Sequence, residues 1–144
     1  AKFGLGGFTE ALAKEVAPLG IFVTSIEPGG FRTDWATASM SFAPDVEGYE
    51  ETVGTRKALF SSDKFIPMGD PDKAAKVMIN LVNDPEPPVH LLLGSEAVAM
   101  VKQANIVRNE EMEKWLPVST STNAYDAIDF TQTEMGKSFF GAKK

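Results

Sequence analysis

The sequence contains no cysteine and a single histidine, His90. Without cysteine the chain can form no disulfide, and it offers no thiolate as a nucleophile or as a metal ligand. The remaining candidate side chains show no metal-ligand spacing, so no metal site is predicted. The lack of cysteine also fits a reducing compartment, and we expect the protein to be cytoplasmic.

Basic residues and long apolar runs are scarce as well. The chain has 14 Lys and Arg against 20 Asp and Glu, which gives a formal net charge of −6 at pH 7. An acidic chain without clustered Lys and Arg does not suit a phosphate backbone, so nucleic acid is not expected as a partner. No apolar run approaches the roughly 18 residues that a membrane-spanning helix needs.

The first 30 residues predict a helix, then a strand, then a turn. Over about 3–19, apolar residues recur at the three- and four-residue spacing of one helical face. The residues of this face are Phe8, Leu12, Val16 and Leu19. Gly20 stands where a left-handed residue would end the helix. Residues 21–27 are rich in β-branched types and predict a buried parallel strand, which a Pro-Gly-Gly sequence at 28–30 ends.

The middle of the chain predicts a short helix and a second helix with a clear start signal. Residues 35–66 are irregular, with a short helix predicted over about 46–61. Asp70 followed by Pro71 is typical of a helix start, because an N-cap precedes proline at the first helical position. The apolar spacing continues this helix through Val82.

The last third predicts a strand and a helix. Residues 89–94 form an apolar run that predicts a second buried strand. A helix is predicted from Ser95 to about Trp115, where Pro117 ends it, and a polar tail follows. Strands separated by helices imply parallel pairing and an α/β fold.

Two stretches near the start resemble a known family. Residues 2–12 (Lys-Phe-Gly-Leu-Gly-Gly-Phe-Thr-Glu-Ala-Leu) are similar to the sequence that follows Tyr-x-x-x at the start of a long helix in short-chain dehydrogenases/reductases. Residues 28–33 (Pro-Gly-Gly-Phe-Arg-Thr) resemble that family's Pro-Gly-x-x-x-Thr turn. The match covers residues 1–35, and the later elements follow in the right order.

The resemblance implies a Rossmann-like fold, a doubly wound parallel sheet of which this chain is the C-terminal portion with two parallel strands and packed helices. Residues 1–116 would form the C-terminal half of an NAD(P)-binding domain, and residues 117–144 a polar tail. The family's tyrosine would be the third residue before Ala1. No Gly-rich dinucleotide loop and no equivalent of the catalytic serine strand occurs in the sequence. The chain is therefore expected to be a fragment that is inactive by itself.

The same resemblance implies roles for particular residues. Lys2, four residues after the tyrosine, would be catalytic and cofactor-binding, since it lowers the tyrosine pKa and binds the nicotinamide ribose. The turn would bind the cofactor through Pro28, Gly29, Phe31 and Thr33, with the Phe31 backbone and the Thr33 hydroxyl addressing the carboxamide and a nearby phosphate. NAD and NADP are not distinguished, because the residues that read the difference follow a strand outside this sequence.

The substrate-covering segment of the family corresponds to the residues after the turn. Its apolar side chains favour a small lipophilic alcohol or carbonyl compound as the substrate. These residues are Trp35, Met40, Phe42 and Tyr49. The implied function is an NAD(P)-dependent oxidoreductase that transfers hydride between nicotinamide and a carbonyl carbon. His90, inside an apolar strand, is predicted to be a buried structural histidine.

A second, non-enzymatic interpretation stays open. Two parallel strands without the rest of a sheet would leave an edge and a helical face uncovered. The chain would then be an α/β module that needs a partner chain or a second copy of itself. The helix that starts near Lys2 also resembles the family's common dimerisation helix, which leaves a homo-oligomer open.

Overall fold

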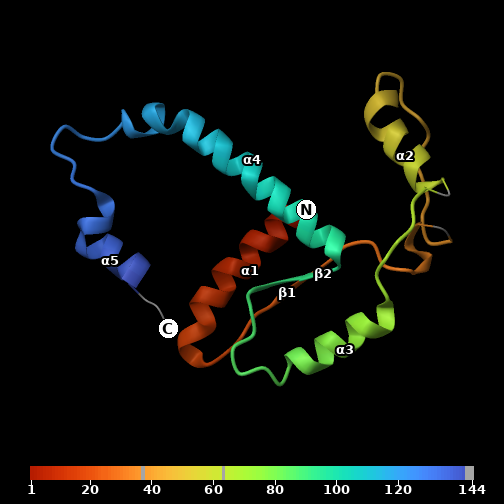
Figure 1. Ribbon diagram of the computed structural model, residues 1–144, viewed down its shortest axis with the longest axis horizontal. Coiled ribbons are helices and arrows are strands. Elements are labelled where there is room, and N and C mark those ends of the chain that lie inside the picture. The colour runs from red at the N-terminus through yellow and green to blue at the C-terminus, as the bar shows by residue number, and fades with distance from the viewer. Residues whose placement is uncertain (37, 63, 142–144) are drawn as a thin grey trace. The chain divides into compact units, whose positions relative to one another are not determined.

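The computed structural model describes residues 1–36, 38–62 and 64–141. By its internal contacts the chain divides into two units, Ala1–Lys102 and Gln103–Lys144. The elements that lie wholly in the first unit are α1 Lys2–Val16, η1 Ala17–Leu19, β1 Ser25–Pro28, η2 Asp34–Ala36, η3 Glu50–Gly54, α2 Thr55–Phe60, α3 Pro71–Leu81 and β2 His90–Leu93 (Figure 1). Helix α4, Ser95–Thr120, begins in the first unit and continues into the second, where η4 Phe130–Gln132 and α5 Glu134–Gly141 follow.

Strands β1 and β2 form a two-stranded parallel sheet, which confirms the predicted α/β arrangement. The register pairs Ser25 with His90 and Pro28 with Leu93, so both strands end at the same edge. The strands are less buried than predicted, since Leu93 is the one buried residue of β1 and β2. The sheet therefore contributes little closed core within the described residues.

Strand β1 starts later than the sequence predicts, at Ser25 opposite His90. The Ser25 N–H donates to the Val89 carbonyl at 2.7 Å, and the Thr24 hydroxyl donates to the Pro88 carbonyl at 2.7 Å. Thr24 thus reaches the Pro88 carbonyl through its side chain, and the paired residues begin at Ser25 and His90. Residues 21–24 consequently stand outside the strand.

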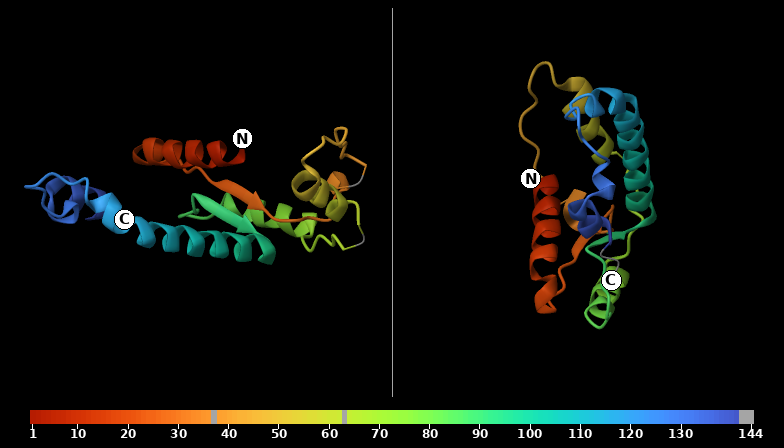
Figure 2. Two further views of the ribbon diagram at one scale, coloured as in Figure 1. Left: turned by 90° about the horizontal axis from the view of Figure 1, so that it is seen from above. Right: turned by 90° about the vertical axis from the view of Figure 1, so that its left-hand side faces the viewer.

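Helix α1 runs alongside the two strands, with its N-terminal end at the edge where they finish (Figure 1 and Figure 2). Its most buried residues are Thr9 and Ala13, each 8% exposed and one helical turn apart. The predicted apolar face is only partly covered, because Phe8 is 62% and Leu19 73% exposed, whereas Leu12 and Val16 are half-buried. Small residues rather than large apolar ones thus form the buried face of this helix.

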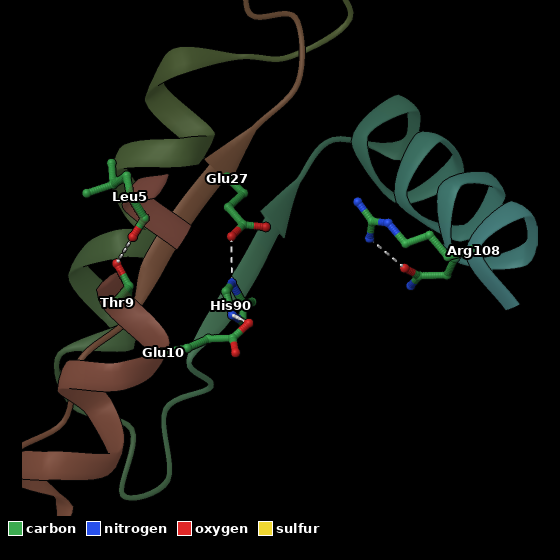
Figure 3. Close-up of polar contacts among 7 residues, drawn as sticks. Leu5, Thr9, Glu10, Glu27, His90 and Arg108 are labelled. Carbon is green, nitrogen blue, oxygen red and sulfur yellow. Dashed lines mark hydrogen bonds and ion pairs between the residues drawn. The ribbon is translucent and has the colours of Figure 1, made fainter. Parts of the chain in front are cut away.

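A histidine joins α1 to both strands. In His90, at the start of β2, Nδ1 lies 2.6 Å from Oε1 of Glu27 on β1, and Nε2 lies 3.1 Å from Oε1 of Glu10 on α1 (Figure 3). The side chain is 36% exposed, so the prediction of a buried histidine is wrong. A neutral imidazole carries a single N–H, and only the imidazolium can donate to both carboxylates. The hydrogen bond to Glu27, followed by the charges of both carboxylates and the bond to Glu10, raises the pKa of His90.

Two predicted helix boundaries are confirmed. Gly20 ends the first helical segment with φ +73°, in the left-handed region that favours glycine. The Asp70 side chain caps α3, because it accepts from the backbone N–H of Asp72 at 2.9 Å and of Lys73 at 3.2 Å. Helix α3 then begins at Pro71, as predicted.

In the second unit, the predicted end of α4 is wrong. The helix continues through Pro117 and ends at Thr120. A proline removes its own N–H but leaves the following residues free to bond, and the Ser121 N–H donates to the Pro117 carbonyl at 3.1 Å. Thr120 Oγ1 donates to the Leu116 carbonyl at 2.9 Å, and Ser121 Oγ donates to the Val118 carbonyl at 2.7 Å.

Part of the predicted polar tail is folded. Within it, η4 and α5 are connected by aromatic contacts, with the ring centroid of Phe130 6.3 Å from that of Phe139 and 6.2 Å from that of Phe140. The predicted division into residues 1–116 and 117–144 stays a prediction. Across the residues that the structure describes, no helix combines the length and apolarity needed to cross a membrane.

Replacing Asp70 tests the cap of α3. We expect Asp70→Ala to lower the free energy of unfolding by about 1 kcal/mol, because two backbone N–H groups lose their acceptor. Urea unfolding would measure the loss, and amide exchange at Asp72 and Lys73 would localise it. Asp70→Asn keeps an acceptor oxygen and should lose much less, so an equal loss in both variants would contradict the capping role.

The titration of His90 tests the contacts between α1 and the strands. We expect its pKa to lie above the ordinary value of 6.5. The stabilisation from these contacts is then complete below pH 6.5 and is lost as the pH rises through the raised pKa. Because this chain holds one histidine, a single imidazole signal in NMR reports the value. Glu27→Gln should lower the pKa more than Glu10→Gln, and a wild-type pKa at or below 6.5 would refute the paired geometry.

Candidate functional site

The candidate site is built around the turn at residues 28–33, which follows β1. The Gly29 N–H donates to the Leu93 carbonyl of β2 at 2.8 Å, so the turn starts against the end of the neighbouring strand. Further along, the Arg32 N–H donates to the Gly69 carbonyl at 2.9 Å. The segment before α3 therefore holds the turn on its second side.

Phe31 sits at the centre of the turn and pairs with Gly69 in an isolated parallel bridge. A Cβ on Gly69 would lie 2.6 Å from the Phe31 ring, so glycine there lets the ring approach the backbone. The Phe31 carbonyl accepts the Thr33 N–H at 2.9 Å, whereas the Phe31 N–H donates no hydrogen bond within the described part of the chain. Thr33 Oγ1 accepts the Trp35 N–H at 3.4 Å.

A cavity of about 850 Å³ lies beside the turn. Its walls come from the turn, the segment after α2, helix α3 and the start of α4, and they are mostly apolar. Large side chains of this lining include Trp35, Phe60, Phe65, Met68, Met78 and Met100. The rings of Trp35 and Phe60 lie 5.5 Å apart at 88°, and those of Phe60 and Phe65 lie 5.0 Å apart at 89°. These edge-to-face contacts make one wall a connected aromatic surface.

Glu96, the second residue of α4, is the one ionisable residue that lines the cavity within the described residues. Its Oε1 accepts the Gly30 N–H at 2.8 Å. Its Oε2 is buried and has no hydrogen-bond partner among the residues that the structure describes. No group of three or more His, Asp or Glu in the same described residues could hold a metal ion.

The structure brings four of the predicted site residues together. Pro28, Gly29, Phe31 and Thr33 all line the cavity. Lys2 does not line it, and its exposed side chain makes no hydrogen bond or ion pair with the described residues. The turn and the lysine are therefore separate parts of the predicted site.

Lys2 nevertheless lies level with the strand ends. Glu10 contacts His90 at the start of β2, which shows how α1 is aligned along the sheet. Lys2 is eight residues before Glu10, about 12 Å along the helix. Leu93 is three residues after His90, about 10 Å along the strand. The N-terminal end of α1 thus reaches the edge at which the turn begins (Figure 1).

The predicted substrate-covering residues are divided by the structure. Trp35 lines the cavity, whereas Met40, Phe42 and Tyr49 are not among its lining residues. Phe42 is 40% exposed, and the Lys57 ammonium lies 5.7 Å from the centroid of its ring. An aromatic residue in this segment therefore need not face the cavity.

Sequence reasoning missed several lining residues, among them Met78, Met100 and Glu96. The two methionines look like ordinary apolar positions of helices, and no local pattern distinguishes them. Glu96 had a usable signal, because it directly follows a predicted parallel strand, and ligand sites gather at the carboxyl ends of such strands.

Proteins with related sequences are oxidoreductases by name, although no protein-family model matches the chain. The chain is 38% identical over 122 residues to oxidoreductase BOA17 of Botryotinia fuckeliana. It is 28% identical over 135 residues to the uncharacterized oxidoreductase C162.03 of Schizosaccharomyces pombe. These alignments cover 85% and 93% of this chain but 44% and 46% of the two relatives. The chain thus spans less than half the length of these proteins.

A solved structure shows the same fold. The crystal structure of a short-chain dehydrogenase from Streptomyces avermitilis matches with a TM-score of 0.71 and 33% sequence identity, over 83% of this chain and 43% of that chain. The parallel strands and their helices therefore form part of a Rossmann-like fold, as predicted. The chain belongs to the short-chain dehydrogenase/reductase family and corresponds to the C-terminal part of its members.

Proposed function

We propose that the whole protein is an NAD(P)-dependent oxidoreductase that interconverts an alcohol and a carbonyl compound by hydride transfer. The observation that carries this proposal is the 28–33 turn, which lies at the carboxyl ends of two parallel strands and beside an apolar cavity. Open α/β sheets bind their ligands at this place. A cytoplasmic location is part of the proposal, because a chain without cysteine suits a reducing compartment.

The turn has the groups that a nicotinamide ring needs. Pro28, Gly29, Phe31 and Thr33 line the cavity and are the residues proposed to hold the ring. The Phe31 N–H has no partner within the described residues, so it is available to a carboxamide oxygen. When bound, the nicotinamide supplies or accepts the hydride. NAD and NADP suit these groups equally.

Lys2 is proposed as a catalytic and cofactor-binding residue. The family's tyrosine, which this sequence does not contain, would stand four residues before Lys2 and share its helix face. An ammonium group close to a phenol favours the phenolate and lowers the tyrosine pKa from about 10. The tyrosine can then exchange a proton with the substrate oxygen, while Lys2 also reaches the ribose hydroxyls.

The cavity favours a small lipophilic substrate. Its volume of about 850 Å³ falls within the range of about 300–1,000 Å³ found for small-molecule sites. The aromatic wall of Trp35, Phe60 and Phe65 gives a rigid apolar surface. The methionines on the remaining walls are flexible and adapt to irregular apolar shapes. A hydrophobic alcohol or ketone is therefore the proposed substrate class.

A second candidate function is that of a non-enzymatic module completed by a partner chain or a second copy. Large apolar side chains favour it, since Phe3 is 82%, Phe8 62% and Phe22 62% exposed. Such surfaces mark interaction sites. This candidate predicts a stable complex and no nicotinamide nucleotide binding by the whole protein, which sedimentation and NADH fluorescence titration would establish together.

Removing the ammonium group of Lys2 tests the catalytic assignment. We expect Lys2→Ala to reduce kcat of the whole protein on the order of 10²- to 10⁴-fold, the range for loss of assisted proton transfer. The melting temperature should barely change, because Lys2 is exposed and unpartnered among the described residues. Lys14→Ala removes another exposed lysine of α1 and serves as the control. Unchanged turnover in Lys2→Ala would exclude the assigned role.

Two aromatic substitutions test the cavity as the substrate site. Trp35→Ala removes a lining ring and should raise KM for a hydrophobic ketone at least about tenfold, because apolar contact area is lost. Phe42→Ala removes a ring outside the lining and should leave KM unchanged. Initial rates with ketones of increasing alkyl length would show both effects. Equal changes in the two variants would argue against the cavity as the binding site.

A further inference from the structure

Three glycines surround one carboxylate at the edge of the sheet. A Cβ on Gly29 would lie 2.6 Å from Glu96 Oε1, and a Cβ on Gly94 would lie 3.0 Å from Oε2. A Cβ on Gly30 would lie 3.6 Å from Oε1, in ordinary contact. Two of these glycines follow β1 and the third follows β2, where its φ is +106°. The Glu96 side chain fits between the strand ends because Gly29 and Gly94 carry no side chain.

The carboxylate holds the backbone of the turn. The hydrogen bond from the Gly30 N–H to Glu96 Oε1, 2.8 Å long, connects two residues that are 66 positions apart. The Gly30 carbonyl accepts the Gly69 N–H at 2.9 Å, and the Gly29 N–H donates to Leu93 at 2.8 Å. The peptide groups directly before Phe31 are thus held from three sides, and Glu96 is the side-chain member of this set.

The second carboxylate oxygen has an unfavourable environment. Oε2 of Glu96 is buried and accepts no hydrogen bond within the described residues. A buried carboxylate oxygen without a partner lowers stability, and a well-packed apolar side chain would avoid that loss. The presence of a carboxylate here is therefore better explained by what Oε1 does for the turn than by stability.

We propose that Glu96 is a positioning residue for the cofactor-binding turn. By fixing the Gly30 amide it sets the conformation of the following residues, and so it places the Phe31 N–H and the Thr33 hydroxyl for the nicotinamide ring. The assignment rests on the proposed function, which gives this turn to the cofactor. In this role Glu96 acts through the backbone of the turn, by the hydrogen bond that its Oε1 accepts from the Gly30 N–H.

Two substitutions of Glu96 in the whole protein test this role. We expect Glu96→Ala to weaken NADH or NADPH binding about tenfold, the effect of losing one hydrogen bond to a charged acceptor. Glu96→Gln keeps an acceptor oxygen for Gly30 and should restore most of the affinity. A merely structural role would lower the melting temperature of both variants without this rescue. Glu111→Gln removes an exposed carboxylate of the same helix and serves as the charge control.

A double-mutant cycle tests the close fit directly. Gly29→Ala places a methyl group against Glu96 Oε1 and should weaken cofactor binding by displacing the carboxylate. In the Glu96→Ala background the obstacle is gone, so the same substitution should weaken binding less than it does in the wild type. Additive effects of the two substitutions would overturn the proposal. This cycle also offers Gly29→Ala as an informative variant if Glu96→Ala does not fold.

Amide exchange at Gly30 separates this inference from the function on which it rests. Faster Gly30 exchange in Glu96→Ala, reversed in Glu96→Gln, supports the positioning role. Unchanged exchange together with unchanged cofactor affinity would overturn that role and leave the proposed function intact. Failure of the wild type to bind NADH or NADPH would overturn the proposed function, and the exchange measurement would still decide whether Glu96 holds the turn.

Discussion

The parallel pairing of β1 with β2 is the constraint on which the rest of the first unit depends. Because Pro28 lies opposite Leu93, the chain leaves both strands at one edge. The turn after β1 and the helix after β2 therefore meet there, although they are far apart in sequence. Parallel strands need a long crossover connection, and here this connection also carries α2 and α3. Residues at the end of α2 and on α3 line the cavity beside the turn, so one topological requirement builds both parts of the site.

Local sequence patterns predicted the helix boundaries that depend on neighbouring residues. The cap at Asp70 and the left-handed Gly20 were found, because each depends on hydrogen bonds or sterics within a few residues. Burial was predicted less well, since it depends on what lies opposite. Phe8 has the spacing of a buried face, yet it is exposed while Thr9 is buried. The start of β1 likewise depends on its pairing with His90, 65 positions after Ser25, which no local pattern of the first strand could reveal.

The same distinction applies to the candidate site. The turn could be found from sequence, because its residues are contiguous and resemble a family motif. Glu96 could not be given its role from sequence, because that role arises from the space left by Gly29 and Gly94. By residue type alone, Trp35 and Phe42 were equally good candidates for contacting the substrate. Only Trp35 of the two lines the cavity, where its ring packs edge-to-face against Phe60. This contact is a tertiary interaction that residue type does not reveal.

Polar contacts position α1 to an unusual degree in this chain. The buried hydrophobic residues among those described are Ala13, Leu93 and Ala97, which supply little apolar area for fixing one element against another. A small core constrains a helix weakly along its own axis, whereas a hydrogen bond to a fixed strand residue sets its register. The bond between His90 and Glu10 makes this contact, and Lys2 lies two helical turns farther along the same helix. An ionisable pair near the start of β2 therefore helps to set the axial position of the proposed catalytic lysine.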